Sequence, residues 1–262
     1  MIVGIFVKQG QTTEFAPVKI FCDELDKFGI ECVFSDNLSS ADLLVIFGGD
    51  GTFLTAKNIA VKYGLPMVGI NTGNVGFLSA FESDDVKSAA KCIYEGSLIF
   101  SERSLIEVEC KGEKFLALND AVIERDKTSV GNSVMAKLKL EIDGSHIFDL
   151  NSDGIIVSSP TGSTAYSLSA GGVVLSPDIK AFIATPICSH SLNSLPIVFS
   201  DDKEVKVSVL NNSCNSLLCC DGRAVKTLSE GDEVFIKKSE SFLSIAESHS
   251  DFFTKLKEKL GK

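Results

Sequence analysis

Strand and helix patterns alternate over the first 95 or so residues, and this alternation constrains the fold more than any other feature of the chain. Strands are predicted at Ile2–Val7, Glu31–Phe34, Asp42–Phe47 and Pro66–Ile70, and helices at Glu14–Phe28, Gly51–Tyr63 and Asp84–Tyr94. Such an alternation predicts a parallel sheet with helices on both faces. Ligands of these sheets bind beyond the carboxyl ends of the strands.

A glycine-rich turn follows one of these strands, where Phe47 is succeeded by Gly48, Gly49, Asp50, Gly51 and Thr52. Glycines allow backbone amides to approach an anion, and the start of the following helix adds partial positive charge. A carboxylate inside the turn can help to hold a metal or accept a proton from an attacking hydroxyl, so the turn indicates phosphoryl transfer. The alternative is a tight turn capped by an aspartate. The turn is neither a P-loop nor a Gly-x-Gly-x-x-Gly dinucleotide motif.

The pattern becomes β-rich from about residue 100. Strands are predicted at Leu105–Cys110, Lys114–Leu118, Val134–Ile142, Gly154–Ser158, Ala181–Ile187, Val205–Leu210, Ser216–Cys220 and Glu233–Ile236. Many alternate between apolar and polar residues, which favours antiparallel sheets. The tail Ser250–Leu260 is predicted to be helical and to pack on the first domain. We therefore predict a parallel-sheet α/β domain of residues 1–98 with 245–262, and a β-sandwich-like domain of residues 99–244.

Composition narrows the classes of function. The formal net charge is −10 and the pI is near 4.9, which argues against nucleic-acid or anionic-membrane partners. No apolar run reaches the ~20 residues of a membrane span, and the N-terminal residues lack a signal-peptide pattern, so we expect a cytoplasmic protein. The eight cysteines form no Cys-x-x-Cys pair, and only three histidines are present. A zinc site is therefore not expected, and most cysteines are predicted to be reduced core thiols.

Three further polar turns follow predicted strands. The segment Asp153–Tyr166 runs from a strand through a Pro-Thr-Gly turn into a short helix rich in hydroxyl groups, which suits a ribose or a phosphate. The pair Asn119 and Asp120 places an amide beside a carboxylate, and Asn71–Leu78 is expected to face the same crevice as the turn at Asp50. Taken alone, each has a plain structural alternative: an N-cap turn, an Asx turn and a flexible Gly/Asn loop.

Together these segments resemble the NAD kinase family. The matching blocks are Gly48–Thr52, Gly69–Leu78, Leu118–Asp120, Asp153–Gly172 and Thr185–Leu192, the last continuing into Pro196–Val198. The first block also occurs in diacylglycerol and sphingosine kinases, whereas the second and fourth are more specific. The resemblance implies two domains with the active site in the cleft between them. It also implies ATP- or polyphosphate-dependent phosphorylation of the 2′-hydroxyl on the adenosine ribose of NAD, a divalent cation (Mg²⁺ or Mn²⁺), and a homodimer or homotetramer.

The resemblance assigns roles to individual residues. Asp50 is expected to be the general base, with metal placement as its alternative role, and Phe77 is expected to form the apolar wall against adenine. The expected phosphate-binding residues are Gly48, Gly49, Gly51, Thr52 and Asn71. The other expected substrate-binding residues are Asn119, Asp120, Asn151, Asp153, Thr164, Ala165, Tyr166, Ser167, Leu168, Ser169 and Arg223.

Two positions depart from the pattern of the family. Asn151 stands where many members carry arginine, so a cationic contact to the substrate is expected to be missing or supplied elsewhere. Arg223 stands where many members carry glutamine, and this cation is expected to alter donor preference or to bind extra phosphate. Two other functions stay open: a lipid kinase of the diacylglycerol or sphingosine type, and a non-catalytic NAD(P)-binding module.

Overall fold

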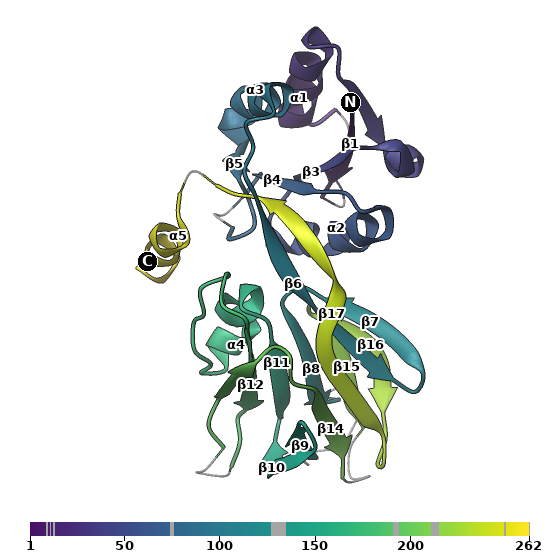
Figure 1. The fold of residues 1–262 in the computed structure, drawn as a ribbon, viewed down its shortest axis with the longest axis vertical. Coiled ribbons are helices and arrows are strands. Elements are labelled where there is room, and N and C mark those ends of the chain that lie inside the picture. Colours follow the sequence, from purple (N-terminus) through teal and green to yellow (C-terminus); the bar gives the residue numbers. More distant parts are fainter. Residues whose placement is uncertain are drawn as a thin grey trace. The chain divides into compact units, whose positions relative to one another are not determined.

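A computed structural model describes residues 1–8, 10, 12, 14–73, 76–126, 135–190, 194–210, 215–248 and 250–261 (Figure 1). The chain divides into two compact units: unit 1 is Met1–Arg103 with Phe242–Lys262, and unit 2 is Ser104–Ser241. The sequence predicted the divisions at 98/99 and 244/245. Both observed divisions fall inside strands, β6 (Phe100–Cys110) and β17 (Glu233–Ala246), so no loop marks them in the sequence.

Unit 1 contains a parallel sheet, as the alternating pattern predicted. Its strands are β1 (Ile2–Val7), β2 (Glu31–Phe34), β3 (Leu43–Phe47), β4 (Met67–Asn71) and the short β5 (Phe81–Glu82). They pair in the order β2-β1-β3-β4, and β4 also pairs in parallel with β5 and, through Met67 and Ile245, with the end of β17. All residues of β3 and β4 are buried, which explains why both read as continuous apolar runs.

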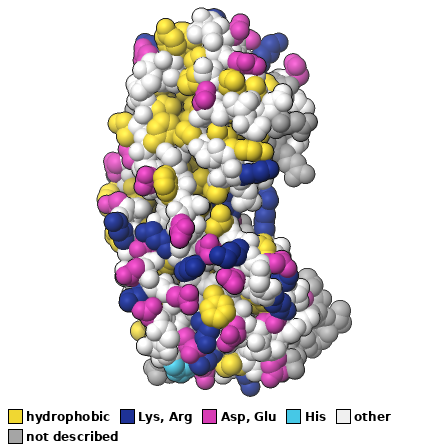
Figure 2. All heavy atoms as spheres, turned by 45° about the vertical axis from the view of Figure 1, so that its right-hand side comes forward, with side chains coloured by type: hydrophobic (Ala, Val, Ile, Leu, Met, Phe, Trp, Pro, Cys, Tyr) yellow, Lys and Arg dark blue, Asp and Glu magenta, His cyan; other side chains and the backbone are white. Residues whose placement is uncertain are grey.

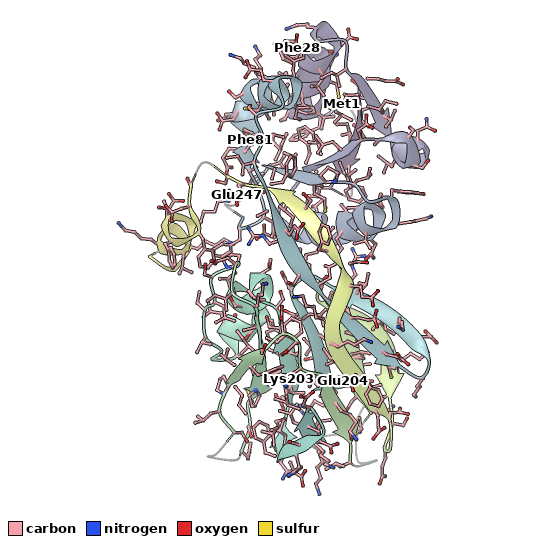
Figure 3. All side chains as sticks on the ribbon, in the orientation of Figure 1. Met1, Phe28, Phe81, Lys203, Glu204 and Glu247 are labelled. Carbon is pink, nitrogen blue, oxygen red and sulfur yellow. The ribbon has the colours of Figure 1, made fainter. Side chains whose placement is uncertain are left out.

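Helices cover both faces of this sheet. The helices α1 (Ala16–Lys27) and α3 (Val86–Glu95) share one hydrophobic core with the strands, and Figure 1 shows α2 (Asp50–Tyr63) on the opposite face. Phe28, labelled in Figure 3 just after α1, stacks on Tyr94 of α3 with ring centroids 4.4 Å apart. A 3-10 turn, η1 (Ser35–Ser40), precedes β3, and a second, η2 (Ser83–Asp85), precedes α3.

Unit 2 is built from antiparallel pairings. One set joins β9 (Ala136–Ile142), β10 (Ser145–Ser152), β14 (Val205–Val209) and β17 in the order β10-β9-β14-β17, with β6 pairing to β17 and to β7 (Glu113–Ala117). The other sheet has the order β13-β12-β11-β8-β15-β16. Its strands are β8 (Asp120–Arg125), β11 (Gly154–Ser158), β12 (Ala181–Ile187), β13 (Ile197–Ser200), β15 (Ser216–Cys220) and β16 (Arg223–Leu228). A single apolar core, including Ile155, Phe182 and Val207, lines both sets.

The structure corrects the sequence prediction at several elements. The strands β5, β8, β10, β13 and β16 were not predicted, and the strand predicted at Glu233–Ile236 continues to Ala246. Strand β10 is polar at many positions because it is the last strand in its pairing order. The C-terminal helix α5 (Phe252–Leu260) begins after Ser250 because the Asp251 side chain accepts the amides of Phe253 and Thr254 at 2.9 and 3.1 Å. Among the described residues, no helix is long and apolar enough to cross a membrane.

Candidate functional site

In unit 1, two predicted ligand-binding loops lie side by side after β3 and β4. The two strands pair through Phe47 and Ile70, and the amide of Gly48 donates to the carbonyl of Ile70 at 3.0 Å. Helix α2 then begins at Asp50, with no side chain capping its first turn. The first amides of a helix have no intrahelical acceptor, so they point to an anion-binding position. A Cβ atom at Gly48 would overlap the side chain of Thr52, so glycine is required there.

The carboxylate of Asp50 joins these two loops. Its Oδ2 accepts the amide of Phe77 at 3.0 Å and its Oδ1 accepts the amide of Leu78 at 3.1 Å. Gly76 lies so close to Oδ1 that a Cβ atom there would collide with the carboxylate. Because the side chain of Asp50 is still 29% exposed, a ligand can reach it. The predicted general base is therefore held in a defined orientation by backbone donors.

Asn71 has a different environment from the one expected for a phosphate ligand. It is 1% exposed, and its Nδ2 donates to Gly73 O at 3.1 Å and to Glu82 Oε2 at 2.7 Å. Its Oδ1 accepts the amide of Gly73 at 3.2 Å. These bonds favour a role in shaping the loop over direct contact with phosphate. Two residues of the same block, 74 and 75, lie outside the described residues.

Helix α5 brings two lysines to these loops. The Nζ of Lys255 donates to Ser79 O at 2.6 Å and to Phe77 O at 3.5 Å. The Nζ of Lys259 lies 3.5 Å from Asp50 Oδ2 and 4.1 Å from the centroid of the Phe77 ring. Burial lowers the pKa of Lys255, although the carboxylates of Asp50 and Glu82 oppose this shift. Sequence reasoning expected the helix to pack on this domain but gave its lysines no role.

In unit 2, the turn that carries Asn119 and Asp120 is held by Asp221. Its carboxylate accepts the amides of Leu118 at 3.0 Å, Asn119 at 2.7 Å and Asp120 at 3.4 Å. Asp221 and Gly222 have φ of +48° and +73°, as two-residue Asp-Gly hairpin turns require. Sequence reasoning missed Asp221 as part of the site, although an Asp-Gly pair between two apolar strands is a hairpin signal.

We expect Asp221→Asn to destabilise the protein by about 1–3 kcal/mol, because buried amides lose a charged acceptor. The same change should raise KM for the substrate held by Asn119 and Asp120. Urea unfolding and steady-state kinetics measure the two effects. The matched control is Asp202→Asn, at an exposed aspartate in the turn before β14. Equal free energies of unfolding for the two variants would contradict the role given to Asp221.

The Pro-Thr-Gly turn packs directly on Asn119. The amide of Ser159 donates to the carbonyl of Asn119 at 2.9 Å, and a Cβ atom at Gly162 would collide with the same residue. The turn continues as η3 (Thr161–Thr164) and the single-turn helix α4 (Tyr166–Ser169). The Oγ of the fully buried Ser163 donates to Pro160 O at 2.7 Å and accepts the amide of Leu175 at 3.0 Å. Ser163 is therefore a structural hydroxyl.

The predicted substrate-binding residues around α4 divide by exposure. Tyr166 is 38% exposed and Ser169 is also exposed, whereas Thr164, Ala165 and Leu168 are half-buried. Ser167 instead points inward, because it is fully buried and its Oγ lies 2.9 Å from Thr185 Oγ1. Burial raises the pKa of Tyr166, and the nearby Glu124, Cys188, Asp153 and Asp120 add to the shift, so the phenol stays protonated at neutral pH.

Three other residues that were predicted to bind the substrate lie on strands of unit 2 or next to them. Asp153 precedes β11, and its Oδ1 lies 2.7 Å from Nε of Arg125, a cation that sequence reasoning missed. Asn151 is exposed on β10, where its carbonyl accepts the amide of His190 at 3.1 Å. Arg223 is exposed at the start of β16, directly after the Asp221 turn.

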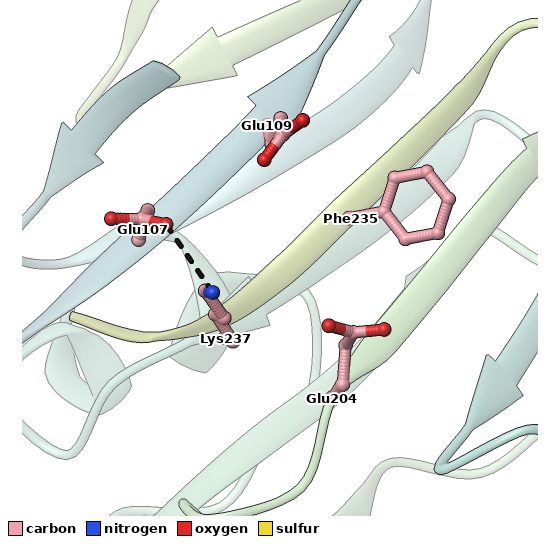
Figure 4. A pocket seen from close by; sticks show the side chains of 5 residues that line it. All are labelled: Glu107, Glu109, Glu204, Phe235 and Lys237. Atoms are coloured by element: carbon pink, nitrogen blue, oxygen red, sulfur yellow. Dashed lines mark ion pairs between the residues drawn. The ribbon is translucent and has the colours of Figure 1, made fainter. Parts of the chain in front are cut away.

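A hollow of about 300 Å³ elsewhere in unit 2 does not suit a phosphate ligand, because Glu107, Glu109 and Glu204 line it. Figure 4 shows its lining, with Glu107 and Glu109 on β6, Phe235 and Lys237 on β17, and Glu204 before β14. The hydrogen bond from Lys114 at 2.9 Å, with Lys237 at 3.6 Å, lowers the pKa of the Glu107 carboxyl. Figure 2 shows acidic and basic side chains interspersed over the lower part of the face in view. Cross-strand ion pairs such as Lys114–Glu107 and Lys206–Glu141 are ordinary features of antiparallel sheets.

Both units match known enzymes in sequence. The profile of the ATP-NAD kinase N-terminal domain matches residues 7–98, and that of the ATP-NAD kinase C-terminal domain matches residues 118–248. An NAD kinase of Aquifex aeolicus is 38% identical over 226 residues, which cover 84% of this chain and 81% of the relative. An NAD kinase of Clostridium tetani is 38% identical over 250 residues, covering 93% and 87%.

Solved structures extend the likeness to the fold. An NAD kinase from Archaeoglobus fulgidus in complex with ATP has a TM-score of 0.79 at 26% identity, covering all of this chain and 98% of the other. Yeast NADH kinase complexed with NADH has a TM-score of 0.88 at 23% identity, covering 100% and 87%. The fold and these matches define the protein as an enzyme of the phosphotransferase class. More narrowly, the chain belongs to the ATP-NAD kinase family, and these matches give no support to the lipid kinase or the non-catalytic module.

Proposed function

We propose that this enzyme is an NAD kinase, which transfers the terminal phosphoryl group of ATP, or of polyphosphate, to the 2′-hydroxyl on the adenosine ribose of NAD. The observation that carries the proposal is the orientation of Asp50. A single carboxylate, fixed by two amides, stands at the head of α2 within a glycine turn. That arrangement suits a reaction in which an alcohol attacks a phosphoryl group.

The residues of unit 1 have distinct parts in this proposal. Asp50 accepts the proton of the 2′-hydroxyl late in the transfer, because a largely dissociative transition state needs little early proton removal. The amides of Gly49 and Gly51, with Thr52, bind phosphate oxygens, whereas the amide of Gly48 donates to Ile70 O and holds the turn on the sheet. Phe77 forms the apolar wall against adenine. Phe77 is half-buried and its own amide donates to Asp50, so its side chain is held near the proposed base, which supports its role as the adenine wall. Asn71 shapes the loop.

The residues of unit 2 bind the rest of the substrate. Asn119 and Asp120 contact the ribose and base of NAD, from a turn fixed by three bonds to Asp221. The exposed ring of Tyr166 stacks on a base, and Thr164, Ala165, Leu168 and Ser169 complete the surface beside it. The inward orientation of Ser167 gives it a supporting part. We assign Asp153 and Asn151 to the nicotinamide end of NAD or to a subunit interface. We assign Arg223 to donor preference or to the binding of an extra phosphate.

We also propose that a divalent cation, Mg²⁺ or Mn²⁺, enters with ATP and offsets phosphate charge during transfer. Within the described residues, no three His, Cys, Asp or Glu side chains cluster so that they could hold a metal. Mg²⁺ commonly binds through one or two carboxylates together with phosphate oxygens and water. Asp50, the one carboxylate of the glycine turn, fits that pattern. The residues of the turn would orient the phosphates that carry the ion.

Compartment and assembly complete the proposal. We place the enzyme in the cytoplasm, and the seven cysteines that the structure describes are all free thiols, which suits a reducing compartment.

We propose a homodimer or homotetramer. The edge strand β13 and the residues before it expose apolar side chains, with Leu195 67% and Val198 47% exposed, and such edges are commonly covered by a partner. Light scattering of the purified chain measures the oligomer.

An activity panel tests the reaction. The purified protein is incubated with NAD or NADH, with ATP or polyphosphate, and with Mg²⁺ or Mn²⁺, and the phosphorylated dinucleotide is quantified. We expect NADP from NAD in at least one donor and metal combination. A diacylglycerol or sphingosine substrate serves as the acceptor control. Absence of NADP under every combination, or phosphorylation of the lipid alone, would overturn the proposal.

A further inference from the structure

The C-terminal helix α5 carries Lys259, whose partly exposed ammonium group lies beside Asp50 and Phe77. In the proposed function, Asp50 accepts the proton of the 2′-hydroxyl and Phe77 contacts the adenine. Nζ of Lys259 lies 3.5 Å from Oδ2 of Asp50 and 4.1 Å from the centroid of the Phe77 ring. The side chains of Lys259 and Asp50 are 33% and 29% exposed, so a ligand can approach both.

The two lysines of α5 differ in how their donors are used. Lys255 is half-buried, and its Nζ donates to the carbonyls of Phe77 and Ser79, so it positions the loop. Among the described residues, Lys259 makes one long contact, to Asp50 at 3.5 Å, and its ammonium lies over the face of the Phe77 ring. Since an ammonium group has three donors, Lys259 retains hydrogen-bonding capacity for a further acceptor.

Local charge explains why a cation is useful here. A phosphate near Asp50 meets a fixed negative carboxylate, and the chain as a whole carries a formal net charge of −10. A positive charge within a few ångströms offsets this repulsion most strongly, because the interaction weakens with distance and salt screens charges that lie farther away. The flexible four-carbon stem of lysine lets its ammonium follow a phosphate as a point charge.

We propose that Lys259 is a phosphate-binding residue of the substrate site. In the bound state its ammonium leaves the Phe77 ring and contacts a phosphate of the NAD molecule whose adenine packs there. This inference rests on the proposed function, since it takes Phe77 as the adenine wall. It assigns part of the recognition of NAD to the C-terminal helix, while Lys255 holds the helix on the loop.

Calorimetric titration with NAD and with adenosine tests the inference, because adenosine offers the same base without phosphate. We expect Lys259→Ala to weaken NAD binding about tenfold, as the loss of one charge-assisted hydrogen bond implies. Adenosine binding should change less than about twofold. Lys259→Arg should retain NAD binding. The matched control is Lys257→Ala, which removes an exposed lysine from the same helix and should leave both affinities unchanged.

Three results would overturn the inference. Equal weakening of NAD and adenosine would give Lys259 a structural part, and tighter binding of both would make α5 a cover over Phe77. Unchanged NAD affinity would remove Lys259 from recognition. Turnover of NAD with ATP is measured on the same preparations. If the protein phosphorylates NAD but Lys259→Ala does not weaken NAD binding, this inference fails and the proposed function stands. If Lys259→Ala weakens NAD binding but the protein does not phosphorylate NAD, the proposed function fails.

Discussion

Asp50→Asn is expected to lower kcat by about 10² to 10⁴-fold, the range that general acid–base catalysis contributes. Asparagine has nearly the same shape as aspartate, but it cannot accept the proton of the 2′-hydroxyl. It keeps one oxygen for the amide of Phe77 or Leu78, so the loop retains part of its anchoring. The dissociation constant for NAD should therefore change little. Steady-state kinetics and calorimetric titration measure the two quantities.

The matched control for this variant is Asp84→Asn, at an exposed aspartate of η2 in the same unit. Thermal unfolding of both variants shows whether the loss of turnover comes from a loss of folded protein. Near-normal turnover in Asp50→Asn would remove Asp50 from the chemistry. A parallel loss of NAD affinity would instead give it a binding role.

Gly76→Ala is expected to lower kcat/KM by about 10²-fold, since a misplacement of about 1 Å in a catalytic group has an effect of that size. The added Cβ atom would collide with Oδ1 of Asp50. Either the carboxylate turns away or the segment that carries Phe77 and Leu78 moves, and both changes break the bonds that orient the base. The loss should appear in kcat as well as in kcat/KM, which steady-state kinetics with NAD and ATP resolves.

Gly73→Ala is the control within the same loop. An added Cβ atom there meets nothing within 4 Å, so we expect nearly normal kinetics. The pair of variants separates a general stiffening of the loop from the specific collision with Asp50. Similar losses in both would contradict the argument, because the positioning of Asp50 would then not be the quantity that changed.

Local sequence predicted most strands that contain a run of apolar residues, but it missed β8, a central strand whose first four residues are buried. The strands β1, β2, β11, β12 and β15 have the bounds that were predicted from apolar runs. The missed strands β10, β13 and β16 each stand at the end of a pairing order and pair with the strand directly before them, β9, β12 and β15. Their pairing is stabilised by neighbours rather than by their own composition, so the pattern alone does not reveal them.

The sequence likewise located the turns that we propose to bind ligands, but not the groups that hold them. The acid of the glycine turn, the Asn119 turn and the hydroxyl-rich turn at Tyr166 were each identified from short motifs. The groups that orient them, Asp221, Arg125 and the lysines of α5, were not identified. Asp221 binds amides about a hundred residues before it, and Lys259 is 209 residues from Asp50. Long-range contacts of this kind leave no local spacing to recognise.

By itself, the sequence determined the parallel and antiparallel halves of the protein and the positions of the turns that we propose to bind phosphate and ribose. These follow from apolar periodicity and from the backbone freedom of glycine, which are local properties. Only the tertiary structure decided which hydrogen bonds hold Asp50, that Ser163 and Ser167 turn inward, and that α5 presents Lys259 at Phe77. The physical reason is that a side chain's direction depends on the atoms packed around it, and the fold brings those atoms from distant parts of the chain.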